Sequence, residues 1–99
     1  MSPEKKLATP TETDIGTWSP GRVLSWYLMC SYLYYICDFS LVSDSVYDTM
    51  AKKILANYES IDHQHKYLVS KDDLAAGTLY SLKDKDYPTM VKNSAERLR

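Results

Sequence analysis

The sequence has little glycine, cysteine or phenylalanine, and no excess of positive charge. Its 99 residues include three glycines, two cysteines and one phenylalanine. With so few glycines, no P-loop or other Gly-rich fingerprint that would cradle a phosphate is present. The 12 basic and 13 acidic residues give a net charge of −1. This balance gives no strong nucleic-acid signal and argues against a basic footprint over the whole surface, because binding to a phosphate backbone needs clustered lysine and arginine. A local basic patch is the alternative.

Long apolar runs are also missing. The most apolar stretch, 23–37, covers 15 residues, contains four tyrosines and ends at Asp38, whereas a membrane-spanning helix needs about 20 apolar residues. The first eighteen residues are polar and contain no apolar segment of the kind found in a secretory signal. We therefore expect a cytoplasmic protein without a membrane partner.

The two cysteines lie in this same apolar stretch, at positions 30 and 37. Seven residues on a helix rise roughly 10 Å, which exceeds the Cα separation of about 7 Å that a disulfide tolerates. A bridge between Cys30 and Cys37 is therefore excluded if the stretch is helical. Free thiols in a reducing cytoplasm are the expected state, and a bridge between two chains is the alternative.

Helix signals predict a mostly α, small single domain built on an antiparallel hairpin of two helices, at about 20–37 and 43–58. Ser19 and Pro20 form a typical start for the first helix, and Ser43 or Asp44 caps the second. Apolar residues recur at helical spacing in the second helix. The connection of about five residues is short enough for antiparallel neighbours.

Weaker signals surround this hairpin. Residues 1–17 mix Pro, Thr, Lys and Glu without a period and are predicted to form a flexible N-terminal arm, so that 18–99 is the single helical domain. Ser70 begins a brief helical turn that Gly77 ends. Residues 78–82 are predicted to be extended, and a short C-terminal helix follows Pro88 to about Leu98.

The first helix of the hairpin is apolar on nearly all sides, which allows two explanations. Either it is central in the domain or it forms an interface with a protein partner or a second copy of the chain. The nine tyrosines, with an apolar ring and a polar tip, are typical of half-buried sites and interfaces.

Two tyrosines end the first helix, and an Asp-x-x-Tyr-Asp pattern opens the second. The second helix carries Asp44, Tyr47 and Asp48, and their spacings of three and four residues place them on one helix face. We therefore expect a site at the mouth of the hairpin, lined by Tyr34, Tyr35, Asp44, Tyr47 and Asp48. Such a site suits a flat, cationic ligand with hydroxyl groups. The alternative is that the tyrosines are core residues and Asp44 only complements the helix dipole.

This stretch resembles the N-terminal helical domain of NAD-dependent DNA ligases. The family pattern, close to YY-x-x-D-x-P-x-(I/V)-S-D-x-x-YD, is matched over about 25 residues, with Ser40 in place of the proline. The matching positions are Tyr34, Tyr35, Asp38, Val42, Ser43, Asp44, Tyr47 and Asp48.

The resemblance implies a site for the nicotinamide mononucleotide (NMN) half of NAD. By this likeness, Tyr34 and Tyr35 contact the nicotinamide nucleotide, Tyr47 stacks on it, and Asp44 and Asp48 bond the ribose or offset the ring charge. The chemistry is consistent, because a cationic ring favours aromatic faces and carboxylates bond hydroxyls well.

Catalysis is not expected from this chain alone. The K-x-D-G motif that carries the adenylated lysine in the resembled family is absent, and without that nucleophile no covalent adenylate forms. Asp62, His63 and His65 are too few and too polar in context to predict a metal site.

Three functions remain open. The first is a non-catalytic interaction module that regulates or inhibits a partner protein in nucleic-acid metabolism or in phage–host interplay, since a free-standing hairpin of this size is typical of small phage-encoded proteins. The second is a stand-alone NMN- or NAD-binding protein. The third is enzymatic, and includes an accessory piece of a split NAD-dependent ligase.

Overall fold

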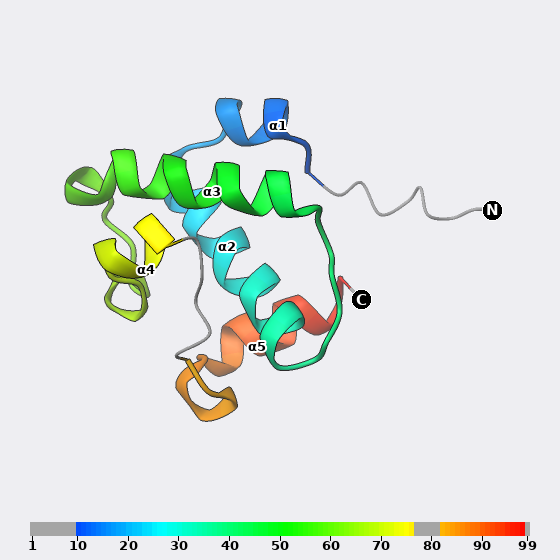
Figure 1. Cartoon of the computed structure of the whole chain (residues 1–99). Coiled ribbons are helices and arrows are strands. Elements are labelled where there is room, and N and C mark those ends of the chain that lie inside the picture. Colours follow the sequence, from blue (N-terminus) through cyan, green and yellow to red (C-terminus); the bar gives the residue numbers. More distant parts are fainter. Residues whose placement is uncertain (1–9, 77–81, 99) are drawn as a thin grey trace.

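A computed structural model of the chain describes residues 10–76 and 82–98. The protein is mostly helical, and no strand occurs among these residues. Five α-helices follow one another, interspersed with short 3-10 turns (Figure 1). They are α1 (Glu12–Thr17), α2 (Pro20–Tyr35), α3 (Asp44–Ala56), α4 (Lys71–Ala76) and α5 (Thr89–Glu96), with turns η2 (Tyr58–Ser60), η3 (Lys66–Leu68) and η4 (Asp84–Asp86). The predicted fold class is therefore confirmed.

Helix α2 is the centre of the molecule. It packs against α3 on one side and against α5 on another, while α1 and α4 contact α3 (Figure 1). Eight of its sixteen residues are buried and lie on more than one face. These are Val23, Leu24, Tyr27, Leu28, Cys30, Ser31, Tyr32 and Leu33.

The burial of α2 supports the first of the two explanations of its apolar character, a central position in the domain. Helices α3 and α5 of the same chain pack on two sides of it, and half of its residues are buried. Among the described residues, Tyr34 is the one large hydrophobic side chain of α2 that is exposed. The central position in the domain accounts for the apolar character of the buried faces of this helix, and an interface through residues 20–37 stays a prediction. No described helix has the length and apolar character needed to cross a bilayer.

The hairpin helices begin where their caps predict. The Ser19 hydroxyl accepts a hydrogen bond from the Arg22 N–H at 3.3 Å, with Pro20 as the first helical residue. The Ser43 hydroxyl accepts one from the Val46 N–H, also at 3.3 Å. These bonds satisfy donors that the first turn of a helix otherwise leaves unpaired.

Helix α2 ends two residues before the predicted boundary at 37. The Cys37 N–H bonds the Tyr32 carbonyl at 3.3 Å and the Phe39 N–H bonds the Leu33 carbonyl at 2.8 Å. Between them Asp38 has a φ of 56°, the left-handed conformation that reverses the chain toward α3. Aspartate is one of the few residues other than glycine that adopts this conformation readily.

The N-terminal segment differs from the predicted flexible arm. Residues Glu12–Thr17 form α1, which begins with a capping box in which the Thr11 hydroxyl accepts from the Asp14 N–H and the Asp14 carboxylate accepts from the Thr11 N–H. The side chain of Ile15 is fully buried in the core. The arm prediction is therefore wrong over this helix, and residues 1–9 lie outside the described part of the chain.

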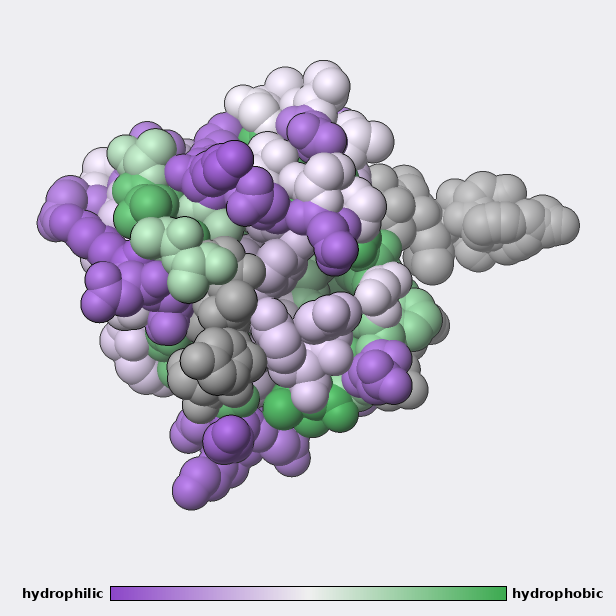
Figure 2. All heavy atoms as spheres, viewed as in Figure 1, coloured by the Kyte–Doolittle hydropathy of each residue, from purple (hydrophilic) through white to green (hydrophobic). Residues whose placement is uncertain are grey.

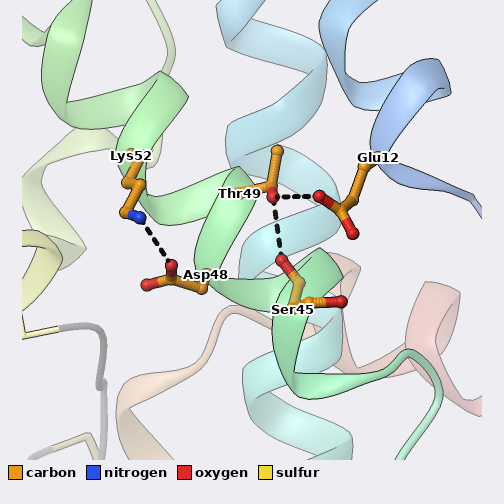
Figure 3. Close-up of polar contacts among 5 residues, drawn as sticks. All are labelled: Glu12, Ser45, Asp48, Thr49 and Lys52. Atoms are coloured by element: carbon orange, nitrogen blue, oxygen red, sulfur yellow. Dashed lines mark hydrogen bonds and ion pairs between the residues drawn. The ribbon is translucent and has the colours of Figure 1, made fainter.

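Helix α1 is held on α3 by polar contacts as well as by Ile15. The Lys53 ammonium donates to the Ile15 and Gly16 carbonyls at 2.9 and 3.0 Å, which satisfies carbonyls at the C-terminal end of α1. The Thr49 hydroxyl lies 3.4 Å from a Glu12 carboxylate oxygen and 2.8 Å from the Ser45 carbonyl (Figure 3).

The remaining elements follow their predictions closely. The Ser70 hydroxyl accepts from the Asp73 N–H at 3.1 Å and begins α4, and α5 begins directly after Pro88 but ends at Glu96, short of Leu98. The predicted helix end at Gly77 lies outside the described residues, as does the predicted extended segment 78–82 except for Leu82.

Position 38 requires a left-handed backbone. The stability of variants at this position should therefore depend on how readily the new residue adopts that conformation. Asp38→Val should lower the free energy of unfolding by about 1–2 kcal/mol, since a β-branched residue is strained at this φ. Asp38→Gly should retain or slightly increase stability. Urea denaturation checks this pair, and equal stabilities of the two variants would contradict the strained turn.

Candidate functional site

The last turn of α2 supplies an aromatic wall. Tyr34 and Tyr35 meet edge to face, with ring centroids 4.9 Å apart and an interplanar angle of 84°. Tyr34 is 49% exposed, whereas Tyr35 is partly buried. Adjacent residues on a helix point about 100° apart, so the pair covers two directions at the helix end.

The first turns of α3 supply carboxylates. Asp44 is the first helical residue, and Asp48 lies one turn further along. An oxygen of Asp48 is 3.0 Å from the ammonium of Lys52, and both side chains are more than half exposed (Figure 3). An exposed pair of this kind contributes about 0.3–0.5 kcal/mol to stability, so Asp48 is not needed for the fold.

Tyr47 joins the site to the core. Its ring stacks on that of Tyr27 of α2, with centroids 4.5 Å apart and an interplanar angle of 18°. Its hydroxyl lies 2.6 Å from the Ser31 hydroxyl, which itself donates to the Tyr27 carbonyl at 2.7 Å. Since the single proton of Ser31 is used in that bond, Tyr47 is the donor to Ser31.

These groups surround one cavity of about 230 Å³ between α2, α3 and the loop that connects them. We call it the hairpin cavity. Its lining residues are Cys30, Tyr34, Tyr35, Ser40, Leu41, Val42, Asp44, Tyr47 and Asp48. All five residues that the sequence indicated as a site therefore line a single cavity.

Four further lining residues were not predicted. Cys30 precedes Tyr34 by one helical turn, so its place on the same face could have been read from the spacing of four. Ser40, Leu41 and Val42 belong to the interhelical loop. Their side-chain directions depend on the turn at Asp38, which no local sequence pattern specified.

The thiol and the tyrosine hydroxyl at the inner side of the cavity are neutral at pH 7. Burial raises the pKa of the Cys30 thiol to about 12, and burial followed by the neighbouring Tyr27 raises the pKa of Tyr47 well above its usual range. A thiol in this state is a poor nucleophile. The cavity therefore presents aromatic faces, a neutral thiol, neutral hydroxyls and the two carboxylates.

A second, smaller cavity of about 120 Å³ lies between α2, the 63–65 segment and α5. There the Ser25 hydroxyl is 2.7 Å from His63 Nε2, a pair 38 residues apart that the sequence did not reveal. His63 Nδ1 accepts the His65 N–H at 3.0 Å, so the ring proton of the neutral imidazole resides on Nε2 and is donated to Ser25.

This protonation state is opposite to the one that activates a serine. A general base must accept the hydroxyl proton, and desolvation together with the nearby His65 lowers the pKa of His63, which keeps the ring neutral. The Ser25–His63 pair is thus a structural hydrogen bond. Within residues 10–76 and 82–98, His, Cys, Asp and Glu side chains form no group of three or more suited to a metal ion.

Hydrophobic residues on the viewed face form small, separate groups, while hydrophilic residues gather over α3 and near η4 (Figure 2). The exposed large hydrophobic side chains of the described chain are Tyr34, Tyr67 and Met90, on three different elements. Singly exposed apolar residues are normal on soluble surfaces. They do not define an apolar docking face.

No protein-family model matches the chain, and comparison with curated proteins and with solved structures gives no significant match. The likeness to the ligase domain therefore stays a prediction based on the motif.

The Tyr47–Ser31 bond can be tested through stability. Tyr47→Phe keeps the ring stacked on Tyr27 but removes the donor to Ser31, so the free energy of unfolding should fall by about 1 kcal/mol. Tyr67→Phe is the control, because that side chain is 75% exposed and should change nothing. Similar losses in both variants by urea denaturation would contradict a specific bond.

Buried tyrosines predict an alkaline limit to stability. Burial raises the pKa of Tyr27 to about 12, above the value of about 10 in an unfolded chain. Its neutral form therefore contributes stability that is complete below pH 10 and is lost as the pH rises toward 12. Ultraviolet titration should show that the buried tyrosines ionise only well above pH 10, together with unfolding. A single transition near pH 10 in a folded chain would contradict this.

Proposed function

We propose that this protein is a non-catalytic binder of nicotinamide nucleotides, NMN or the nicotinamide half of NAD, in the hairpin cavity. The observation that carries the proposal is that Tyr34, Tyr35, Asp44, Tyr47 and Asp48, singled out by the ligase-like motif, all line one cavity. The motif and the geometry thus indicate the same group of residues.

The cavity has the chemistry that such a ligand needs. Aromatic faces attract a cationic pyridinium ring, and the Asp44 and Asp48 carboxylates can accept hydrogen bonds from ribose hydroxyls. One face of Tyr47 is stacked on Tyr27, which fixes the ring for contact on its other side.

The size of the cavity favours half of a dinucleotide. At about 230 Å³ it is smaller than the roughly 300–1,000 Å³ of sites that enclose drug-sized ligands. A ring with its ribose is the part enclosed, and the rest of the ligand extends into solvent. Absence of the K-x-D-G lysine supports binding without adenylate transfer.

Calorimetric titration of the full chain with NMN tests the proposal. Wild type should bind saturably with one site, and Asp48→Asn should weaken binding about tenfold, because a charge-assisted hydrogen bond is lost. Tyr35→Ala should weaken it by a similar factor through loss of an aromatic contact.

Asp72→Asn is the matched control, since it removes an equivalent carboxylate from α4, outside the cavity, and should leave affinity unchanged. Circular dichroism of each variant establishes that the fold is kept. Unchanged affinity in both cavity variants, or no heat up to millimolar NMN, would refute the proposal.

A second candidate is the interaction module that regulates a partner in nucleic-acid metabolism. The observation in its favour is Tyr34, which is 49% exposed beside the cavity, since interfaces favour exposed aromatic anchors. The burial of half of α2 within the domain leaves less apolar surface on that helix for a partner. Addition of the chain to an NAD-dependent ligase that lacks its own helical hairpin tests this role; unchanged adenylation, with no complex in solution, would reject such a partner.

A further inference from the structure

The charged side chains that line the hairpin cavity in the described chain are both acidic. Asp44 and Asp48 are carboxylates, and the other lining groups are neutral: tyrosine rings, a serine, aliphatic side chains and the Cys30 thiol. No lysine, arginine or histidine belongs to this lining. Lys52 offsets part of the Asp48 charge across 3.0 Å, but as an exposed pair in water.

This charge distribution treats the two ends of NMN differently. The pyridinium ring carries a positive charge that the carboxylates attract, whereas the 5′-phosphate carries negative charge that they repel. The lining offers that phosphate no cation to offset the repulsion. The nucleoside, which has no phosphate, keeps the attraction between the pyridinium ring and the carboxylates and avoids the repulsion between the phosphate and the carboxylates.

We propose that the hairpin cavity selects a pyridinium nucleoside that lacks the phosphate, so that nicotinamide riboside binds more tightly than NMN. The inference rests on the proposed function, because it concerns the same cavity and the same ring. Among pyridinium ligands it names the nucleoside, a cation whose ribose carries hydroxyls and no phosphate, as the preferred form.

The same electrostatics gives selectivity for the oxidised ring. Reduction of nicotinamide adds a hydride and removes the positive charge, while the ribose hydroxyls and the overall size are almost unchanged. Without that charge, the attraction of the tyrosine faces and of the two carboxylates is lost. The reduced riboside is therefore expected to bind much more weakly than the oxidised one.

Calorimetry of the full chain with nicotinamide riboside and NMN, at low salt and at about 0.15 M salt, tests the proposal. At low salt the riboside should bind at least about fivefold more tightly. The preference should narrow at 0.15 M, where the Debye length is about 8 Å and exposed charges are screened.

Two variants report on the cause. Asp44→Asn combined with Asp48→Asn keeps the shape but removes both charges, so the preference should disappear. Lys52→Gln removes the cation paired with Asp48 and should increase the preference. NMN binding as tightly as the riboside, or more tightly, at low salt would overturn the inference while leaving the proposed function intact. No binding of either compound would overturn both.

Discussion

Helix α2 has apolar side chains on nearly every side, and a short chain must cover them all. The arrangement of the other helices follows from that constraint: α3 and α5 pack on different faces of α2, and α1 and α4 pack on α3. Burial of large side chains such as Tyr27, Leu28 and Leu33 supplies the main stabilisation. The polar bond between Ser31 and Tyr47 then fixes how α3 lies against its neighbour.

The candidate site forms where α2 ends and the chain turns back toward α3. Left-handed backbone at Asp38 turns the chain immediately after α2, so the tyrosines at the end of one helix face the carboxylates at the start of the next. The connecting loop closes the third side of the cavity. Tyr47 belongs both to the core and to the candidate site, because its ring stacks on Tyr27 and also lines the hairpin cavity. The fold and the candidate site therefore depend on the same few contacts.

Local sequence signals were sufficient to predict the hairpin and the grouping of the five candidate residues, which line one cavity. Caps at Ser19 and Ser43 and the helical spacing of apolar residues act over a few positions, so they can be read directly. Helix α1 was missed because its signals, a Thr11–Asp14 capping box and one apolar residue, gain meaning only once α3 provides a surface. The Ser25–His63 bond joins residues 38 apart, and the fold alone brings them together.

The attachment of α1 determines which part of the chain forms the folding unit. The side chain of Ile15 is fully buried in the core, and the Lys53 ammonium donates hydrogen bonds to the carbonyls of Ile15 and Gly16. A protein shortened to begin at Trp18 would lose the Ile15 side chain and so leave apolar surface of α3 uncovered. The Lys53 ammonium would also lose its two carbonyl acceptors. Fusions, tags and cleavage sites inserted between Pro10 and Trp18 would therefore separate α1 from the core that it completes.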